Sequence, residues 1–232
     1  MRKMIKENAK AALRLNYWPM VGIELLAGVL AGGGSFSGGT GMNQEQMQKI
    51  QDAVQNSEIA RAIIGTMLVA SAIASVVALL YTLLFGNVIQ VGAAGIRLGV
   101  YRRQGFRFVD LFAGLKRYGR TVGTMALYTL FTVLGFCVFI VPGIIVALGL
   151  FEVPYLLAED PNISGMTAIR KSWEDMKGHK GELFVFGLSF LGWFILTGLT
   201  LGVLGVFYVG PYYAIAEAGF YHELHANDTI AA

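Results

Sequence analysis

The sequence predicts an all-α membrane protein, a polytopic bundle of six transmembrane helices arranged as three hairpins. Hydrophobic residues make up 55% of its 232 residues and charged residues only 14%, whereas soluble domains carry about a quarter charged residues. Three long stretches, 62–96, 121–151 and 183–216, contain no charge at all. A helix needs about 20 apolar residues to cross a bilayer, so each stretch holds at least one span. A soluble enzyme and a disordered chain are therefore excluded.

The lengths of the uncharged stretches decide how they divide into spans. As one helix, residues 121–158 would measure about 57 Å, which is too long for one crossing. Pro142-Gly143 lies near its middle, and this pair favours a turn. Residues 183–224 divide in the same way, with a break at residues 200–205. The predicted spans are residues 17–33, 62–86 (continuing to about 101), 121–140, 143–158, 182–201 and 205–224, in one domain over 1–225 with a short tail at 226–232.

The segments between the hairpins are predicted to lie on the membrane surface. Residues 1–15 place Ile5, Ala9 and Leu13 at helical spacing among basic residues, which is typical of a helix in the headgroup plane. The same pattern recurs within 102–120 and 159–181, so we expect a basic amphipathic helix before each hairpin. Either three parallel repeats or topology alone accounts for this recurrence. Residues 34–61 are expected to form a Gly-rich outer loop.

The positions of Lys and Arg predict the orientation. Sixteen of the 18 fall within 1–15, 97–120 and 170–180, and six spans place all sixteen on the cytoplasmic side. Both termini are then cytoplasmic, and the protein is a multi-pass plasma-membrane protein. We expect contact with the bilayer and its anionic headgroups, and no nucleic acid. The residues expected to contact anionic lipid are Arg102, Arg103, Arg107, Lys116, Arg117, Arg120, Arg170 and Lys171.

Ionisable side chains within predicted spans are few. Glu24 and Glu217 lie near the middle of the first and last spans, and Glu152 lies in the cytoplasmic half of the fourth. Carboxylates are costly inside a bilayer and are often functional, so the three form a candidate proton or cation site. The alternative is that they are protonated or snorkelling side chains that bond a neighbouring helix. Arg97 is the nearest basic residue that could neutralise them.

Other chemistry has weaker support. His222 and His225 are three residues apart on one helical face, which makes them candidate metal ligands, although the sequence supplies no third ligand. The alternative is a polar helix end at the membrane surface. Cys137, the single cysteine, and Ser189 have no evident base, and no phosphate-binding glycine motif is present. We therefore expect no catalytic residue, no cofactor and no enzymatic activity.

A series of motifs in the second half of the chain is distinctive. Residues 154–161 read Pro-Tyr-Leu-Leu-Ala-Glu-Asp-Pro, residues 168–172 read Ala-Ile-Arg-Lys-Ser, and residues 176–180 read Met-Lys-Gly-His-Lys. Pro211-Tyr212 and Phe220-Tyr221 continue the series. It resembles the uncharacterised bacterial integral-membrane family called domain of unknown function 975, over roughly residues 1–225. The resemblance implies a bacterial plasma-membrane protein and carries no reaction or ligand.

Two functions remain open from the sequence. The lack of a catalytic set favours a membrane scaffold or an accessory subunit, with a membrane-protein partner or a second copy of the chain. The alternative is a small transporter or channel that uses Glu24 and Glu217 as a proton- or cation-linked pair. The arrangement of these two glutamates discriminates between them. Convergence on one cavity favours transport, whereas separate packed positions favour a scaffold.

Overall fold

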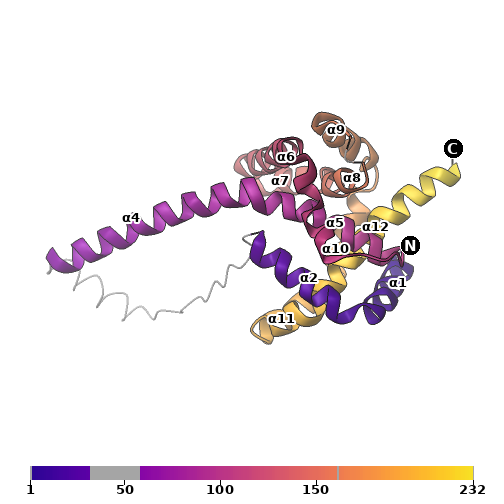
Figure 1. Ribbon diagram of the computed structural model, residues 1–232, viewed down its shortest axis with the longest axis horizontal. Helices are drawn as coiled ribbons and strands as arrows, with labels where there is room; N and C mark the ends of the chain where they lie inside the picture. Colours follow the sequence, from indigo (N-terminus) through magenta and orange to yellow (C-terminus); the bar gives the residue numbers. More distant parts are fainter. Residues whose placement is uncertain (1, 32–57, 161, 232) are drawn as a thin grey trace.

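The computed structural model describes residues 2–31, 58–160 and 162–231, and helices are the only regular secondary structure among these residues (Figure 1). The all-α prediction is confirmed. Most of the predicted 34–61 loop lies outside the described residues, and residues 58–61 belong to a helix. The α-helices are α1 (Arg2–Leu15), α2 (Tyr17–Leu30), α4 (Glu58–Tyr81), α5 (Asn87–Tyr101), α6 (Tyr118–Val138), α7 (Ile140–Gly149), α8 (Val153–Glu159), α9 (Gly165–Asp175), α10 (Lys180–Leu188), α11 (Leu191–Leu199) and α12 (Gly210–Ala231). Two π-helical turns, η1 (Thr82–Gly86) and η3 (Gly205–Val209), and a 3-10 helix, η2 (Phe108–Arg117), complete the set.

Four helical stretches are long and apolar enough to cross a membrane, and they overlap the second to fifth predicted spans. The first predicted span corresponds to the shorter apolar helix α2, and the sixth lies in η3 and α12, outside these four. A membrane protein with four candidate crossings is therefore supported, and six spans stays a prediction. The four stretches are Arg61–Tyr101, Phe108–Val138, Ile140–Glu159 and Lys180–Leu199.

The two helix breaks predicted within the long apolar stretches have different outcomes in the structure. The break predicted at residues 200–205 is confirmed, because Leu201 and Gly202 adopt positive φ angles of 50° and 86°. The break predicted at Pro142-Gly143 is displaced: the chain leaves the helix at Phe139, where the backbone is extended. Pro142 instead lies in the first turn of α7, where a missing N–H breaks no helical hydrogen bond.

Helix α5 lies at the centre of the bundle and packs against α2, α12, α8 and η2. Its close approach to η2 requires glycine on both sides. A Cβ at Gly92 would overlap the backbone of Leu111, and a Cβ at Gly114 would lie 2.6 Å from the carbonyl oxygen of Val88. The glycine-rich second half of the Arg61–Tyr101 stretch therefore allows α5 to lie in the core.

The amphipathic helix α1 uses its apolar face differently from the prediction. Ile5, Ala9, Ala12 and Leu13 are buried in the protein core, and α1 packs along α12. This face therefore contacts the bundle and not the lipid. Helix α4, in contrast, extends away from the bundle, and none of its most apolar residues is buried (Figure 1).

Candidate functional site

The centre of the bundle contains an ion pair between Arg97 on α5 and Glu24 on α2. Arg97 Nε donates to Glu24 Oε1 at 2.8 Å, and Nη2 donates to Oε2 at 2.7 Å. The two side chains are only 15% and 16% exposed. Two parallel charge-assisted hydrogen bonds are the strongest geometry available to a guanidinium and a carboxylate. The carboxylate of the first predicted span is thus neutralised by the basic residue that the sequence indicated.

Arg97 also lines a small polar cavity of about 180 Å³, together with Glu217 of α12. The polar side chains of Gln90, Tyr128 and Tyr155 line the same cavity. Glu217 lies near enough to Arg97 and to the Tyr213 hydroxyl to interact electrostatically with both. The structure therefore brings Glu24 and Glu217 to the same arginine, Arg97, although Glu24 does not itself line the cavity.

The charges at this centre do not balance. Two carboxylates face one guanidinium, so the group carries a net charge of −1 when all three residues are ionised. Water is scarce between packed helices, and an uncompensated charge is costly there. A proton or a small cation at Glu217 would restore neutrality, because Glu24 is already engaged by both arms of Arg97.

Glu217 also lies at the edge of a second, apolar groove of about 390 Å³. Its walls are the side chains of α6, α7, α10 and α11, including Phe136, Leu183 and Phe194. Ala147, Phe151 and Glu217 line both the groove and the polar cavity. Glu217 is thus the ionisable residue at the junction between an apolar opening and the polar centre.

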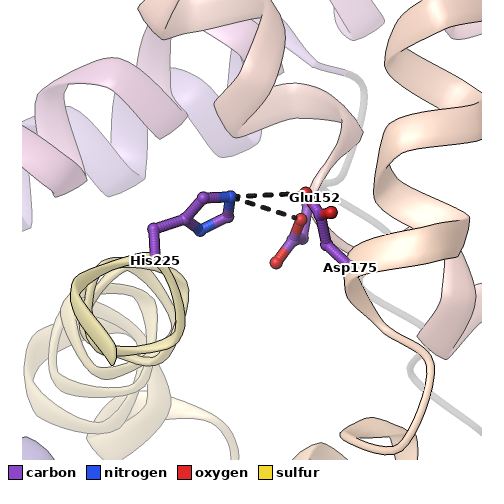
Figure 2. A group of neighbouring side chains, drawn as sticks. All are labelled: Glu152, Asp175 and His225. Atoms are coloured by element: carbon purple, nitrogen blue, oxygen red, sulfur yellow. Dashed lines mark ion pairs between the residues drawn. The ribbon is translucent and has the colours of Figure 1, made fainter. Parts of the chain in front are cut away.

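Glu152 does not join the other two glutamates, which corrects the three-residue site inferred from the sequence. It is fully buried and lies beside Asp175 and His225 (Figure 2). His225 Nε2 is 3.4 Å from Asp175 Oδ2 and 3.9 Å from Glu152 Oε2. The sequence analysis missed Asp175 because its spacing from Glu152 and His225 in the sequence follows no ligand pattern. Asp175 reaches these two residues because it lies at the end of α9.

The predicted histidine pair is also separated. His222 accepts a hydrogen bond of 3.2 Å from Arg102 Nε and packs against the ring of Tyr101. His225 instead faces the two carboxylates (Figure 2). Residues three apart on a helix lie on neighbouring sides of it, and here those sides face different elements. His222 is therefore not a ligand partner of His225.

Of the eight residues expected to contact anionic lipid, seven are exposed. Arg102 is the exception, because its Nη1 lies 2.5 Å from Glu159 Oε1. Lys116, Arg117 and Arg120 line a cavity of about 450 Å³ beside the glycine-rich face of α5. Their exposure leaves these cations accessible to an anionic surface, and lipid contact stays a prediction.

Comparison with known proteins gives a family match over part of the chain and no activity. Residues 119–228 match the family model described as "Protein of unknown function (DUF975)". The resemblance predicted from the sequence is therefore confirmed over that part of the chain. The match includes Glu152, Asp175, Glu217 and His225, whereas Glu24 and Arg97 precede it. No curated protein and no solved structure matches the chain.

Proposed function

We propose, starting from the DUF975 match and the polar centre, that the protein transports protons or small cations across a bacterial plasma membrane. In this proposal six helices span the membrane, both termini are cytoplasmic, and the chain catalyses no covalent reaction. The carrying observation is that Glu217 lines a polar cavity beside Arg97, whose guanidinium already binds Glu24 through two hydrogen bonds. Glu24 does not line this cavity itself, but it shares Arg97 with Glu217, and two carboxylates at one arginine support a transport function.

Arg97 has two alternative partners in this mechanism. A proton or cation on Glu217 leaves Arg97 paired with Glu24, and the centre is neutral. Loss of that ion leaves a carboxylate at Glu217 that attracts Arg97 away from Glu24. Because α2 and α12 both pack against α5, the exchange shifts the balance of contacts on two sides of that helix. Coupling between ion binding and helix position follows from this competition.

The surface charges support the proposed orientation. The exposed Arg and Lys residues of η2 and α9 face the cytoplasm and contact anionic headgroups, each contributing about 1 kcal/mol to membrane association. This attraction holds the cytoplasmic ends of the helices at the interface. No nucleic acid is involved, because the same charges already satisfy the positive-inside distribution.

The test is ion flux into liposomes that contain the purified full-length protein. The wild type is expected to dissipate an imposed proton or cation gradient, and Glu217→Gln is expected to slow the flux at least tenfold. Glu182→Gln, which changes an exposed glutamate of α10, is the matched control and retains the wild-type rate. Folded wild-type protein without flux, or equal flux in Glu217→Gln, would exclude this transport function.

The exposure of α4 favours a second function, that of a scaffold or accessory subunit. Among the described residues nothing buries a face of this apolar helix, so a membrane-protein partner or a second copy has room to pack along it. Cysteines placed at Ser71 or Ser75 of α4, in a Cys137→Ser background, test the second copy. Rapid disulfide cross-linking in the membrane supports self-association, and its absence at both positions argues against it.

A further inference from the structure

We propose that Glu152, Asp175 and His225 bind one divalent transition-metal ion, of which Zn²⁺ is the best match. The site is separate from the Arg97 cavity and does not depend on the transport proposal. It combines residues from three places in the fold: the N-cap of α8, the end of α9 and the second half of α12 (Figure 2). Each side chain contributes one donor atom, and the three atoms lie within 4.8 Å of one another.

The distances suit a first-row metal. Metal–ligand bonds of about 2.1 Å in tetrahedral geometry separate neighbouring ligand atoms by about 3.4 Å. His225 Nε2 lies 3.4 Å from Asp175 Oδ2 and 3.9 Å from Glu152 Oε2. Small side-chain adjustments therefore suffice to place all three atoms around one ion.

The second imidazole nitrogen selects the ligating form of His225. Its Nδ1 lies 3.1 Å from the carbonyl oxygen of Tyr221, one helical turn earlier. A carbonyl only accepts hydrogen bonds, so Nδ1 carries the proton and donates it there. The lone pair of a neutral ring is then on Nε2, which faces the carboxylates. This is the arrangement by which metal-binding histidines are oriented in proteins.

The backbone that carries two of the ligands is fixed before any ion arrives. Glu152 is fully buried, and its backbone N–H donates to Ser172 Oγ at 3.2 Å. The Ser172 hydroxyl donates in turn to the carbonyl oxygen of Gly149 at 2.9 Å. These two bonds connect Ser172 of α9 to the junction between α7 and α8. Ser172 lies three residues before Asp175 on the same helix. The segments that carry Glu152 and Asp175 are therefore fixed relative to each other, which lowers the entropy that ion binding costs.

The donor set also indicates which ion binds. One imidazole nitrogen and two carboxylate oxygens resemble the His and acidic ligands of zinc sites, whereas Mg²⁺ and Ca²⁺ prefer oxygen ligands alone. Three protein ligands leave a fourth position open to water or another ligand. The ion would connect α12 to α9, so it would stabilise the C-terminal part of the bundle.

The competing occupant is a proton. A protonated His225 would carry a positive charge between the same two carboxylates and satisfy them without a metal. The two cases differ in stoichiometric metal content and in spectroscopy, because an imidazolium cannot coordinate Co²⁺. Measurements of metal binding therefore decide between them without reference to transport.

The experiment uses full-length protein in detergent, stripped with a chelator and then titrated with Zn²⁺ and with Co²⁺. The wild type is expected to retain one Zn²⁺ per chain and to give the visible absorption of low-symmetry Co²⁺. His225→Ala, Asp175→Asn and Glu152→Gln should each weaken Zn²⁺ binding at least tenfold. His222→Ala, which removes the neighbouring histidine, should bind as tightly as the wild type.

A substitution that restores a ligand separates binding from folding. Asp175→His should keep one bound ion and shift the Co²⁺ absorption, because nitrogen replaces oxygen in the donor set. All variants are first compared by size-exclusion chromatography to verify the fold. Wild-type protein that holds no stoichiometric Zn²⁺ or Co²⁺ would overturn the proposal, as would equal loss of binding in His222→Ala and His225→Ala.

Discussion

Arg97 on α5 holds Glu24 on α2 through two hydrogen bonds of 2.7 and 2.8 Å, in a pair that is largely shielded from solvent. The residues are 73 positions apart in the sequence. Each would be costly alone in the bundle, so the pair makes the presence of both tolerable. The pair also connects α2 to the central helix α5. Because Arg97 already binds Glu24, Glu217 has to share this arginine.

Removal of Arg97 should destabilise the protein. Arg97→Ala leaves Glu24 with an uncompensated charge, which costs about 3 kcal/mol in partly buried pairs. Thermal unfolding of Arg97→Ala in mild detergent should show a clearly lower midpoint than that of the wild type. The midpoint of Arg97→Lys should lie between these two, since one ammonium cannot reproduce the two parallel bonds. Arg117→Ala, at an exposed arginine of η2, is the control and should leave the midpoint unchanged. Equal midpoints for Arg97→Ala and the wild type would contradict a stabilising pair.

The contact between α5 and η2 should not tolerate a side chain at Gly92. A Cβ there would overlap the backbone of Leu111, so Gly92→Ala forces the two elements apart. We expect a loss of about 2 kcal/mol or more, as for other overpacked sites. Gly99→Ala lies two helical turns further along α5, and a Cβ there meets nothing within 4 Å. Chemical unfolding of both variants should separate them clearly; similar stabilities would show that the α5–η2 contact is loose.

The turn between α11 and η3 stores strain at Leu201. Its φ of 50° is unfavourable for a branched side chain, whereas asparagine tolerates it. Leu201→Asn is therefore expected to raise stability by about 0.5–1 kcal/mol. The adjacent Gly202→Ala should have the opposite sign, because alanine is strained at a φ of 86°. If both changes lowered the unfolding midpoint alike, the turn would not have this conformation.

The hydrogen bond between Tyr221 and Glu159 should be measurable. The Tyr221 hydroxyl of α12 donates to Glu159 Oε2 of α8 at 2.6 Å, and a bond to a charged acceptor contributes about 1.5 kcal/mol. Tyr221→Phe keeps the ring and its stacking on Tyr155, so the loss reports on the hydroxyl alone. Tyr81→Phe, at an exposed ring of α4, is the reference substitution. A loss no larger than that of Tyr81→Phe would show that this bond adds no stability.

The six-span topology predicts opposite labelling of two cysteines. In a Cys137→Ser background, Lys171→Cys lies on the cytoplasmic side and Leu201→Cys on the outer side. A membrane-impermeant thiol reagent applied to intact cells should label Leu201→Cys only, and permeabilisation should then expose Lys171→Cys. Labelling of both positions in intact cells, or of neither, would contradict the predicted hairpin between residues 182 and 224.

The helical segments could largely be inferred from the chain itself. Apolar length, the spacing of Ile5, Ala9 and Leu13, and the turn signal near Gly202 each act within about 20 residues. Over such short distances along the chain, the order of the residues determines which side chains are buried and which backbone conformations are allowed. The error at Pro142 has the same origin, since proline interrupts a helix interior yet is well tolerated in a first turn, and the sequence does not distinguish the two positions.

The identity of the charged partners was decided only by tertiary structure. The sequence singled out Glu24, Glu217, Glu152 and His225 because ionisable groups are costly in apolar surroundings. It named Arg97 as the nearest basic residue, but it did not indicate which glutamate Arg97 binds, or that Glu152 and His225 meet Asp175 at a separate place. These pairings join residues 23 to 73 positions apart, through the packing of α2, α9 and α12 against their neighbours. The chain alone therefore determined which residues needed partners, and the packing of distant helices determined which partners they found.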